Sequence, residues 1–318
     1  MKKFFILCLS VFFAYLMSGC GMYSDSDKAN YSDTSYRVQD DLGTEFVFAE
    51  APQRIITNGL AYQDILFAMV PVENFAAVSA ASLDANYSLT ADKAKLVKNR
   101  FEQPITVEAV LAYKPDIYIT SDGVAKEINQ TLRDMGIKVF VIKSARSYDD
   151  IKHTIKKLAE LTAQKEKGIS LIKQMDDKKQ RLQNRLSAID NSNRKTVVEL
   201  TYSGTYGMLQ HVFGMICDLA KARDGMQVMP VRSGMVVSKE RLLTLDPDVL
   251  LLPTWDAKGN QNSDAYFQQI VSDPAYSNLK CIRQQTVYKY PEKYRYCVSH
   301  YIVDAAEYMA KLVYPEYF

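Results

Sequence analysis

An internal repeat constrains the fold of this chain more than any other feature of its sequence. Residues 107–120 read VEAVLAYKPDIYIT, and residues 239–252, which lie 132 positions further along, read KERLLTLDPDVLLL. The identical pairs are Glu108 with Glu240, Leu111 with Leu243, Pro115 with Pro247 and Asp116 with Asp248. Because proline disfavours helical geometry in the residue before it, each copy predicts a short helix that ends at a Pro-Asp turn. The apolar runs that follow, 117–120 and 249–252, are typical of parallel strands covered on both faces.

The segments around the two copies are also similar in kind, since in each half one strand leads into a helix and a later strand precedes another. The predicted strands are 54–57, 138–142, 196–200 and 286–290, and the predicted helices are 62–69, 207–220 and those that start near Ser147 and Ser299. Strands and helices that alternate at these lengths predict parallel sheets. The predicted fold class is therefore α/β, with two parallel-sheet lobes, 37–146 and 191–318, joined by a single long helix and a ligand cleft between them.

The segment 147–190 between the lobes is predicted to be helical, because its apolar residues recur at steps of three, four or seven. Ser147 with Asp150 gives a start that resembles a capping box. An unbroken helix of this length would span about 60 Å, which is too long for either lobe. We therefore expect the polar stretch 162–168 to interrupt it, and the second part, about 165–189, to cross between the lobes.

Residues 1–19 are predicted to be a lipoprotein signal peptide. Lys2 and Lys3 precede an apolar run at 4–17, which is short for a membrane span and typical of a secretory signal. The sequence LMSGC at 16–20 resembles the lipobox of bacterial lipoproteins, which implies cleavage before Cys20 and lipidation of that cysteine. The polar segment 20–36 is then a flexible tether that holds the protein at the membrane, facing the periplasm or the outside. An ordinary signal peptide with an incidental cysteine is the alternative.

Charge and cysteine content exclude several classes of protein. Lys plus Arg is 39 and Asp plus Glu is 37, a balance that argues against a nucleic-acid binder. After the predicted cleavage the cysteines beyond the tether are Cys217, Cys281 and Cys297. A disulfide between Cys281 and Cys297 is predicted because both lie in one compact segment, with three reduced thiols as the alternative. No histidine or cysteine pair has metal-site spacing, so no protein-bound metal or cofactor is expected.

The chain contains no G-x-S-x-G, P-loop or G-x-G-x-x-G motif, so no catalytic signature is present. Ligands of open α/β sheets bind outside the carboxyl ends of the strands, so the loops after the strands of two facing sheets should line a cleft. The predicted ligand-binding residues in these loops are Asn58, Tyr62, Tyr87, Ser121, Tyr202, Tyr206, Trp255, Tyr294 and Arg295. Their aromatic character favours a large, partly aromatic or amphipathic ligand. Each also has an ordinary alternative role, such as turn formation by Asn58 or packing of Tyr202 and Tyr206 at a helix start.

Taken in order, these features resemble a known family. The tether, the segment YRVQDDLGTEFVFAEAPQRII at 36–56, the first repeat, the inter-lobe helix and the tail VYKYPEKYRYCVSHYIVDAAEYMAKLVYP follow the order of ABC-transporter substrate-binding proteins for ferric siderophores, haem and cobalamin. The likeness covers nearly all of the chain from about residue 36. It departs at 220–236, where that family usually has a Gly-rich turn and an Asn.

The resemblance implies a monomeric binding protein, not an enzyme, that delivers a ferric siderophore to an ABC-transporter permease and its ATPase. Iron chelates are preferred because Arg232, Lys289, Lys293 and Arg295 near the rim of the second lobe suit an anionic chelate. Cobalamin or haem in the same role is the alternative ligand. The same architecture also serves chelatase and metallocluster enzymes, and a surface lipoprotein that contacts host or matrix proteins is a further alternative.

The resemblance also implies an acidic residue on each lobe that meets basic residues of the permease. The matching stretch of the first lobe, SLTADKAKLVKNRFEQP, is mostly basic, and its acids are Asp92 and Glu102. In the second lobe Asp224, inside the departing stretch, is the nearest candidate. The prediction is that Asp92 or Glu102 acts together with Asp224, and the alternative is a permease that reads a different charge pattern.

Overall fold

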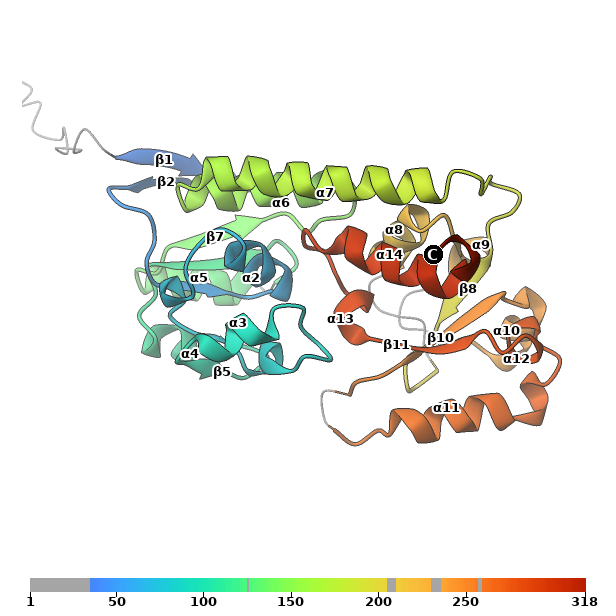
Figure 1. Cartoon of the computed structure of the whole chain (residues 1–318). Helices are drawn as coiled ribbons and strands as arrows, with labels where there is room; N and C mark the ends of the chain where they lie inside the picture. Colours follow the sequence, from blue (N-terminus) through green and yellow to red (C-terminus); the bar gives the residue numbers. More distant parts are fainter. Residues whose placement is uncertain (1–34, 125, 205–209, 230–235, 257–258) are drawn as a thin grey trace, which may run out of the picture.

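The computed structural model describes residues 35–318, apart from 125, 205–209, 230–235 and 257–258. This part of the chain forms two α/β lobes that lie side by side, with one long helix across both (Figure 1). The predicted fold class is confirmed. Within the described ranges no helix is both long enough and apolar enough to cross a membrane.

The first lobe is built on a parallel sheet with the strand order β3-β6-β7. Its strands are β3 (Ile55–Thr57), β6 (Ile117–Ser121) and β7 (Val139–Ile142). Two smaller sheets lie beside it: the antiparallel hairpin β1 (Tyr36–Gln39) and β2 (Glu45–Phe48), and the parallel pair β4 (Val78–Ser79) and β5 (Arg100–Phe101). The helices are α2 (Leu60–Phe67), α3 (Ala91–Leu96), α4 (Val107–Ala112) and α5 (Lys126–Asp134), with 3-10 turns at Val72–Asn74 and Ala80–Leu83.

The second lobe is built on a parallel sheet with the order β11-β10-β8-β9. Its strands are β8 (Thr196–Glu199), β9 (Arg223–Asp224), β10 (Val249–Pro253) and β11 (Val287–Tyr290). Its longer helices are α8 (Gln210–Leu219), α10 (Lys239–Leu245), α11 (Ser263–Ser272) and α14 (Ile302–Val313). Shorter helical turns are α9 (Gly225–Val228), α12 (Lys280–Arg283), α13 (Glu292–Arg295), Pro274–Tyr276 and Pro315–Tyr317.

The internal repeat has the same structural role in both lobes. The Asp116 carboxylate accepts a hydrogen bond from the N–H of Arg54 at 2.9 Å, and the Asp116 N–H donates to the Arg54 carbonyl at 2.8 Å. Asp248 exchanges the equivalent pair of bonds with Thr196, at 2.7 and 2.9 Å. The Pro-Asp turn therefore fixes the start of the neighbouring parallel strand. β6 and β10 are almost wholly buried, as their apolar sequences predict.

The connection between the lobes consists of two helices, α6 (Tyr148–Leu161) and α7 (Lys165–Arg185). Ser147 caps α6 by accepting the N–H of Asp150 at 3.1 Å. The chain leaves the helical path at Ala163, which has a positive φ of 54°. The break between the two helices thus falls within the polar stretch 162–168, as predicted.

α7 is the long helix that joins the two lobes (Figure 1). It is about 32 Å long at the usual helical rise. The Lys167 ammonium donates to the Met69 carbonyl of the first lobe at 2.7 Å. The Lys178 ammonium pairs with Asp304 of the second lobe at 2.7 Å. Since α7 also packs against both α6 and α14, it holds the lobes at one side.

The predicted disulfide is wrong. Cys217, Cys281 and Cys297 are all free thiols and all buried. Cys281 lies before β11 and Cys297 after it, so the strand separates them. A strand of this length rises about 13 Å, whereas a disulfide needs α-carbons within about 7 Å. Proximity in sequence was misleading because an extended strand lies between the two cysteines.

Candidate ligand-binding site

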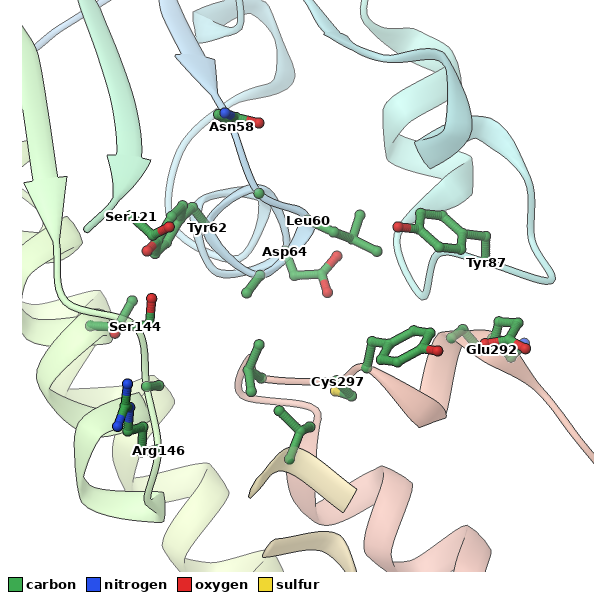
Figure 2. A pocket seen from close by; sticks show the side chains of 18 residues that line it. Asn58, Leu60, Tyr62, Asp64, Tyr87, Ser121, Ser144, Arg146, Glu292 and Cys297 are labelled. Carbon is green, nitrogen blue, oxygen red and sulfur yellow. The ribbon is translucent and has the colours of Figure 1, made fainter. Parts of the chain in front are cut away.

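A pocket of about 400 Å³ lies between the lobes (Figure 2). The first lobe contributes the turn into α2, Ser121 at the end of β6, the loop after β7, and Tyr87. The second lobe contributes Val212 of α8 and the loop after β11. The lining residues are 58–62, 64, 87, 121, 144–146, 154, 212, 292, 293 and 296–298. The volume is within the usual range for small-molecule sites, and the walls come from strand-end loops of both lobes.

The amino end of α2 faces this pocket (Figure 2). Gly59 precedes the helix with φ of 156°, and no side chain caps the helix there. A Cβ at Gly59 would lie 3.1 Å from the ring of Tyr62, so a larger residue would be strained and crowded. The first N–H groups of a helix have no partner within it and carry partial positive charge. This wall of the pocket can therefore donate hydrogen bonds to an acceptor or anionic group.

Asp64 lies on the same helix and its carboxylate is directed into the space between the lobes (Figure 2). It is only 4% exposed. Its two oxygens accept hydrogen bonds from the Thr90 hydroxyl at 2.7 Å and the Ser299 hydroxyl at 3.2 Å. The second bond joins the two lobes. Burial raises the pKa of Asp64 to about 7, although both hydroxyl bonds lower it.

A buried charge cluster lies behind the opposite wall. The Arg295 guanidinium lies 3.5 Å from a Glu199 oxygen and 3.3 Å from a Glu292 oxygen, and it donates to the Leu200 carbonyl at 3.1 Å. Burial raises the pKa of Glu199 to about 7 and also raises that of Glu292, while the charge of Arg295 lowers both. Of these three side chains only Glu292 lines the pocket.

The prediction that Arg295 binds ligand is therefore contradicted. Its side chain is fully buried, and its charge is taken up by Glu199 and Glu292. A buried guanidinium without carboxylate partners would be strongly destabilising, which is the physical reason that α13 turns it inward. Position in a strand-end loop indicated nearness to the pocket but not the direction of the side chain.

Tyr87 and Trp255 form a direct contact between the lobes. Their rings stack with centroids 4.4 Å apart and planes 26° apart. The Trp255 indole N–H donates to the Asp84 carboxylate at 2.8 Å, and the Lys293 N–H donates to the Asn86 carbonyl at 3.1 Å. We call these five residues the lobe contact. Of the two rings, Tyr87 also lines the pocket and Trp255 does not.

The other predicted residues divide between the pocket and its surroundings. Asn58, Tyr62 and Ser121 line it together with Tyr87. Tyr202 instead packs edge-on against Tyr266, with centroids 5.2 Å apart, and Tyr294 stacks on Tyr308 at 4.6 Å. Tyr206, Arg232 and Cys20 lie outside the described residues. Within the described ranges no group of three or more His, Cys, Asp or Glu is arranged to hold a metal ion.

Sequence reasoning missed several residues of the pocket wall. Asp64 is an acid within the apolar helix α2, a signal that the sequence contains but that was not used. Ser144 and Arg146 follow β7, and the strand-end rule applied to that strand would have found them. Arg146 is exposed, and its charge, with hydrogen bonds from Ser144, lowers the pKa of Asp122 in spite of partial burial.

The proposed docking acids differ in accessibility. The Asp92 side chain is fully exposed, 3.8 Å from Lys95, and Glu102 is also exposed. Asp224 is only 2% exposed and caps α9 by accepting the N–H of Met226 at 2.9 Å. The prediction for Asp224 is wrong, because a carboxylate enclosed at a helix start cannot meet another protein.

Comparison with known proteins gives both sequence relatives and similar structures. "Probable siderophore-binding lipoprotein YfiY" of Bacillus subtilis is 25% identical over 289 residues, which cover 86% of this chain and 88% of that protein. "Molybdate-binding protein MolA" of Haemophilus influenzae is 23% identical over 240 residues, 67% of this chain and 65% of that protein, so slightly less than two thirds of its length is matched. The structure of a periplasmic heme-binding protein, RhuT, from a Roseiflexus species superposes with a TM-score of 0.70 at 17% identity and covers 84% of this chain and 99% of that one.

A family model described as "Periplasmic binding protein" matches residues 55–294. The match begins at β3, includes both copies of the repeat and ends in α13, so it covers both sheets and the helices that connect them. The chain therefore belongs to the periplasmic binding protein family.

Proposed function

We propose that this protein is the substrate-binding component of an ABC importer, which captures a ferric siderophore outside the cytoplasmic membrane and delivers it to a permease and its ATPase. The observation that carries the proposal is the pocket between the lobes, whose walls are the strand-end loops of both sheets. A pocket of this size at the strand ends of two sheets is typical of small-solute sites, and together with the family it favours a carrier.

The choice of an iron chelate rests on the relatives and not on the rim charges. YfiY, whose match covers more of both chains, is described as siderophore-binding, whereas MolA is described as molybdate-binding. Arg295 is neutralised within the second lobe, and Lys289 pairs with Asp264. Neither Arg295 nor Lys289 therefore supports the prediction that basic rim residues select an anionic chelate.

Attachment to the membrane is part of the proposal. Cleavage before Cys20 and its lipidation would leave 20–35 as a tether ahead of β1, one residue shorter than predicted because Tyr36 is the first residue of β1. In Figure 1 the described chain begins at β1, at the far end of the first lobe from the pocket. A tether attached there leaves the pocket accessible while the protein stays close to its permease.

A ligand titration tests the function. Trp255 is the only tryptophan of the chain and lies in the lobe contact, so its fluorescence should respond when the lobes adjust to a ligand. We expect saturable binding of a ferric siderophore with a Kd of about a micromolar or tighter, and calorimetry would detect binding that leaves fluorescence unchanged. Molybdate, haemin, nickel-histidine and cyanocobalamin are the competitors. Binding of one of these with no binding of any ferric chelate would contradict the iron assignment.

A further inference from the structure

The carboxylate of Asp64 is a buried charge whose known partners are all uncharged. Both of its hydrogen bonds come from neutral hydroxyls, those of Thr90 and Ser299. Among the residues that the structure describes, no Lys, Arg or His nitrogen lies within 4.0 Å of it. Buried charges in proteins are normally paired with an opposite charge, since desolvation is costly. Asp64 lines the pocket, so a bound ligand can supply that opposite charge.

The cations of the pocket wall do not balance Asp64. Arg146 lines the pocket but is exposed, and its charge lowers the pKa of Asp122. The Lys293 ammonium lies over the ring of Tyr294, 5.6 Å from its centroid. Glu292, the other carboxylate in the wall, already faces Arg295, which it shares with Glu199. Among the described residues of the wall, Asp64 is therefore the carboxylate that has no cation paired with it.

We propose that Asp64 is a specificity-determining residue that receives a positively charged, hydrogen-bond-donating group of the ligand, so that the preferred chelate is a ferric hydroxamate with a pendant ammonium. This rests on the proposed function, that the pocket binds a ferric siderophore. A ferric tris-hydroxamate core has no net charge, whereas a ferric tris-catecholate is a trianion. A trianion beside Asp64 would be repelled, but a neutral core with an ammonium arm would place its single charge against Asp64.

A matched pair of probes isolates the ammonium. Ferrioxamine B carries a pendant ammonium, and its N-acetylated form is the same chelate without that charge. At pH 8, calorimetric titration of the wild-type protein should show ferrioxamine B binding at least tenfold more tightly than the acetylated form, and a ferric tris-catecholate binding weakest. This measurement needs no variant, so it is independent of any effect of mutation on folding.

Asp64→Asn then assigns the preference to its residue. The amide has nearly the same shape, its oxygen can accept from one of the two hydroxyls, and its NH2 group can donate to the oxygen of the other. We therefore expect the two hydroxamate chelates to bind with affinities within about twofold of each other. Asp134→Asn, an exposed acid on α5, is the control and should keep the tenfold preference. A residue that only bridges the lobes would change both affinities equally and leave their ratio intact.

The outcomes separate this inference from the function on which it rests. If no ferric chelate binds, the proposed function fails and the inference with it. If both hydroxamate chelates bind equally well to the wild type, or the catecholate binds best, the role of Asp64 is overturned and the function stands. A preference that persists in Asp64→Asn also overturns the role of Asp64.

Discussion

The two lobes are held together in different ways on the two sides of the pocket. On one side, α7 packs along both lobes and places Met175 and Leu182 in a hydrophobic cluster that extends through both. On the other side, the lobe contact consists of one ring stack and two hydrogen bonds. Apolar burial over a long helix is worth far more than a few exposed polar contacts. Movements that admit a ligand should therefore open the lobe contact while α7 stays rigid.

The largest effect is expected from damage to the α7 side. Met175→Ala removes a side chain that is 1% exposed and should lower the free energy of unfolding by about 2–5 kcal/mol. Lys173→Ala, an exposed position two residues earlier, should change it by less than about 0.5 kcal/mol. Urea denaturation followed by circular dichroism measures both. Equal effects of the two substitutions would show that α7 is not the main connection.

Asp64 lines the pocket and accepts a hydrogen bond from Ser299 of the other lobe. It should have a pH-dependent effect on stability. Its native pKa of about 7 exceeds the ordinary value, so the folded protein binds the proton more strongly than the unfolded chain does. The resulting penalty is complete above about pH 7 and disappears as the pH falls toward 4. Asp64→Asn removes it, and should stabilise the protein by up to about 4 kcal/mol at pH 8 and by little near pH 4.

Thermal unfolding of wild type and variant across this pH range is the measurement. The groups that act on Asp64 or are acted on by it are the hydroxyls of Thr90 and Ser299, the thiol of Cys297 and the phenol of Tyr301. His300, next in the chain to Ser299, titrates in the same pH range, because burial lowers its pKa to about 4. The difference between wild type and variant cancels the titration of His300. If Asp64→Asn stabilises the protein less at pH 8 than at pH 5, the pKa of Asp64 is not raised in the folded protein.

The lobe contact should tolerate change with a smaller loss. Tyr87→Leu removes the ring stack and should cost about 0.5–1.5 kcal/mol of stability. The freed Trp255 should become more exposed, so its emission should shift to longer wavelength. Tyr113→Leu, on the far part of the first lobe, should leave the emission unchanged. An emission spectrum identical to wild type in Tyr87→Leu would mean that the stack is not what encloses Trp255.

The smallest effect is expected at the outer surface. Asp92→Lys reverses a fully exposed charge away from the pocket wall. If Asp92 contacts the permease, association should slow several-fold at low salt while ligand affinity is unchanged, because rim charges act mainly on association rate. Surface plasmon resonance with the permease in nanodiscs checks this. An unchanged rate at low salt would remove Asp92 from the docking surface.

The sequence predicted the fold better than the site, for identifiable reasons. The Pro-Asp repeat works through backbone geometry and local hydrogen bonds, so Asp116 and Asp248 could be assigned without knowledge of tertiary contacts. The strand-end rule pointed to the loops that line the pocket, Asn58 and Tyr62 among them, and their contact with a ligand stays a prediction. It could not reveal that Trp255 and Tyr87 stack directly on each other between the lobes, because their packing depends on how the two lobes meet.

Burial direction was the other source of error. Arg295 and Asp224 were predicted as accessible charges, and both are buried: Arg295 faces Glu199 and Glu292, and Asp224 caps α9. Asp64 is the opposite case: one acid in the apolar run around 60–70 was visible in the sequence, and its burial follows from the helix packing under the pocket. An isolated charge in an apolar helix therefore deserved as much weight as the loop aromatics.

Hydrogen exchange of the protein with and without ferrioxamine B tests the central claim most directly, namely that the ligand binds between the lobes. Protection should appear in 58–64, 144–146 and 292–298, the segments that supply most of the pocket-lining residues, and around the lobe contact. The exchange of α7 should stay unchanged, because that side is already closed. Protection confined to the outer surface of either lobe, with none in the pocket segments, would contradict the account.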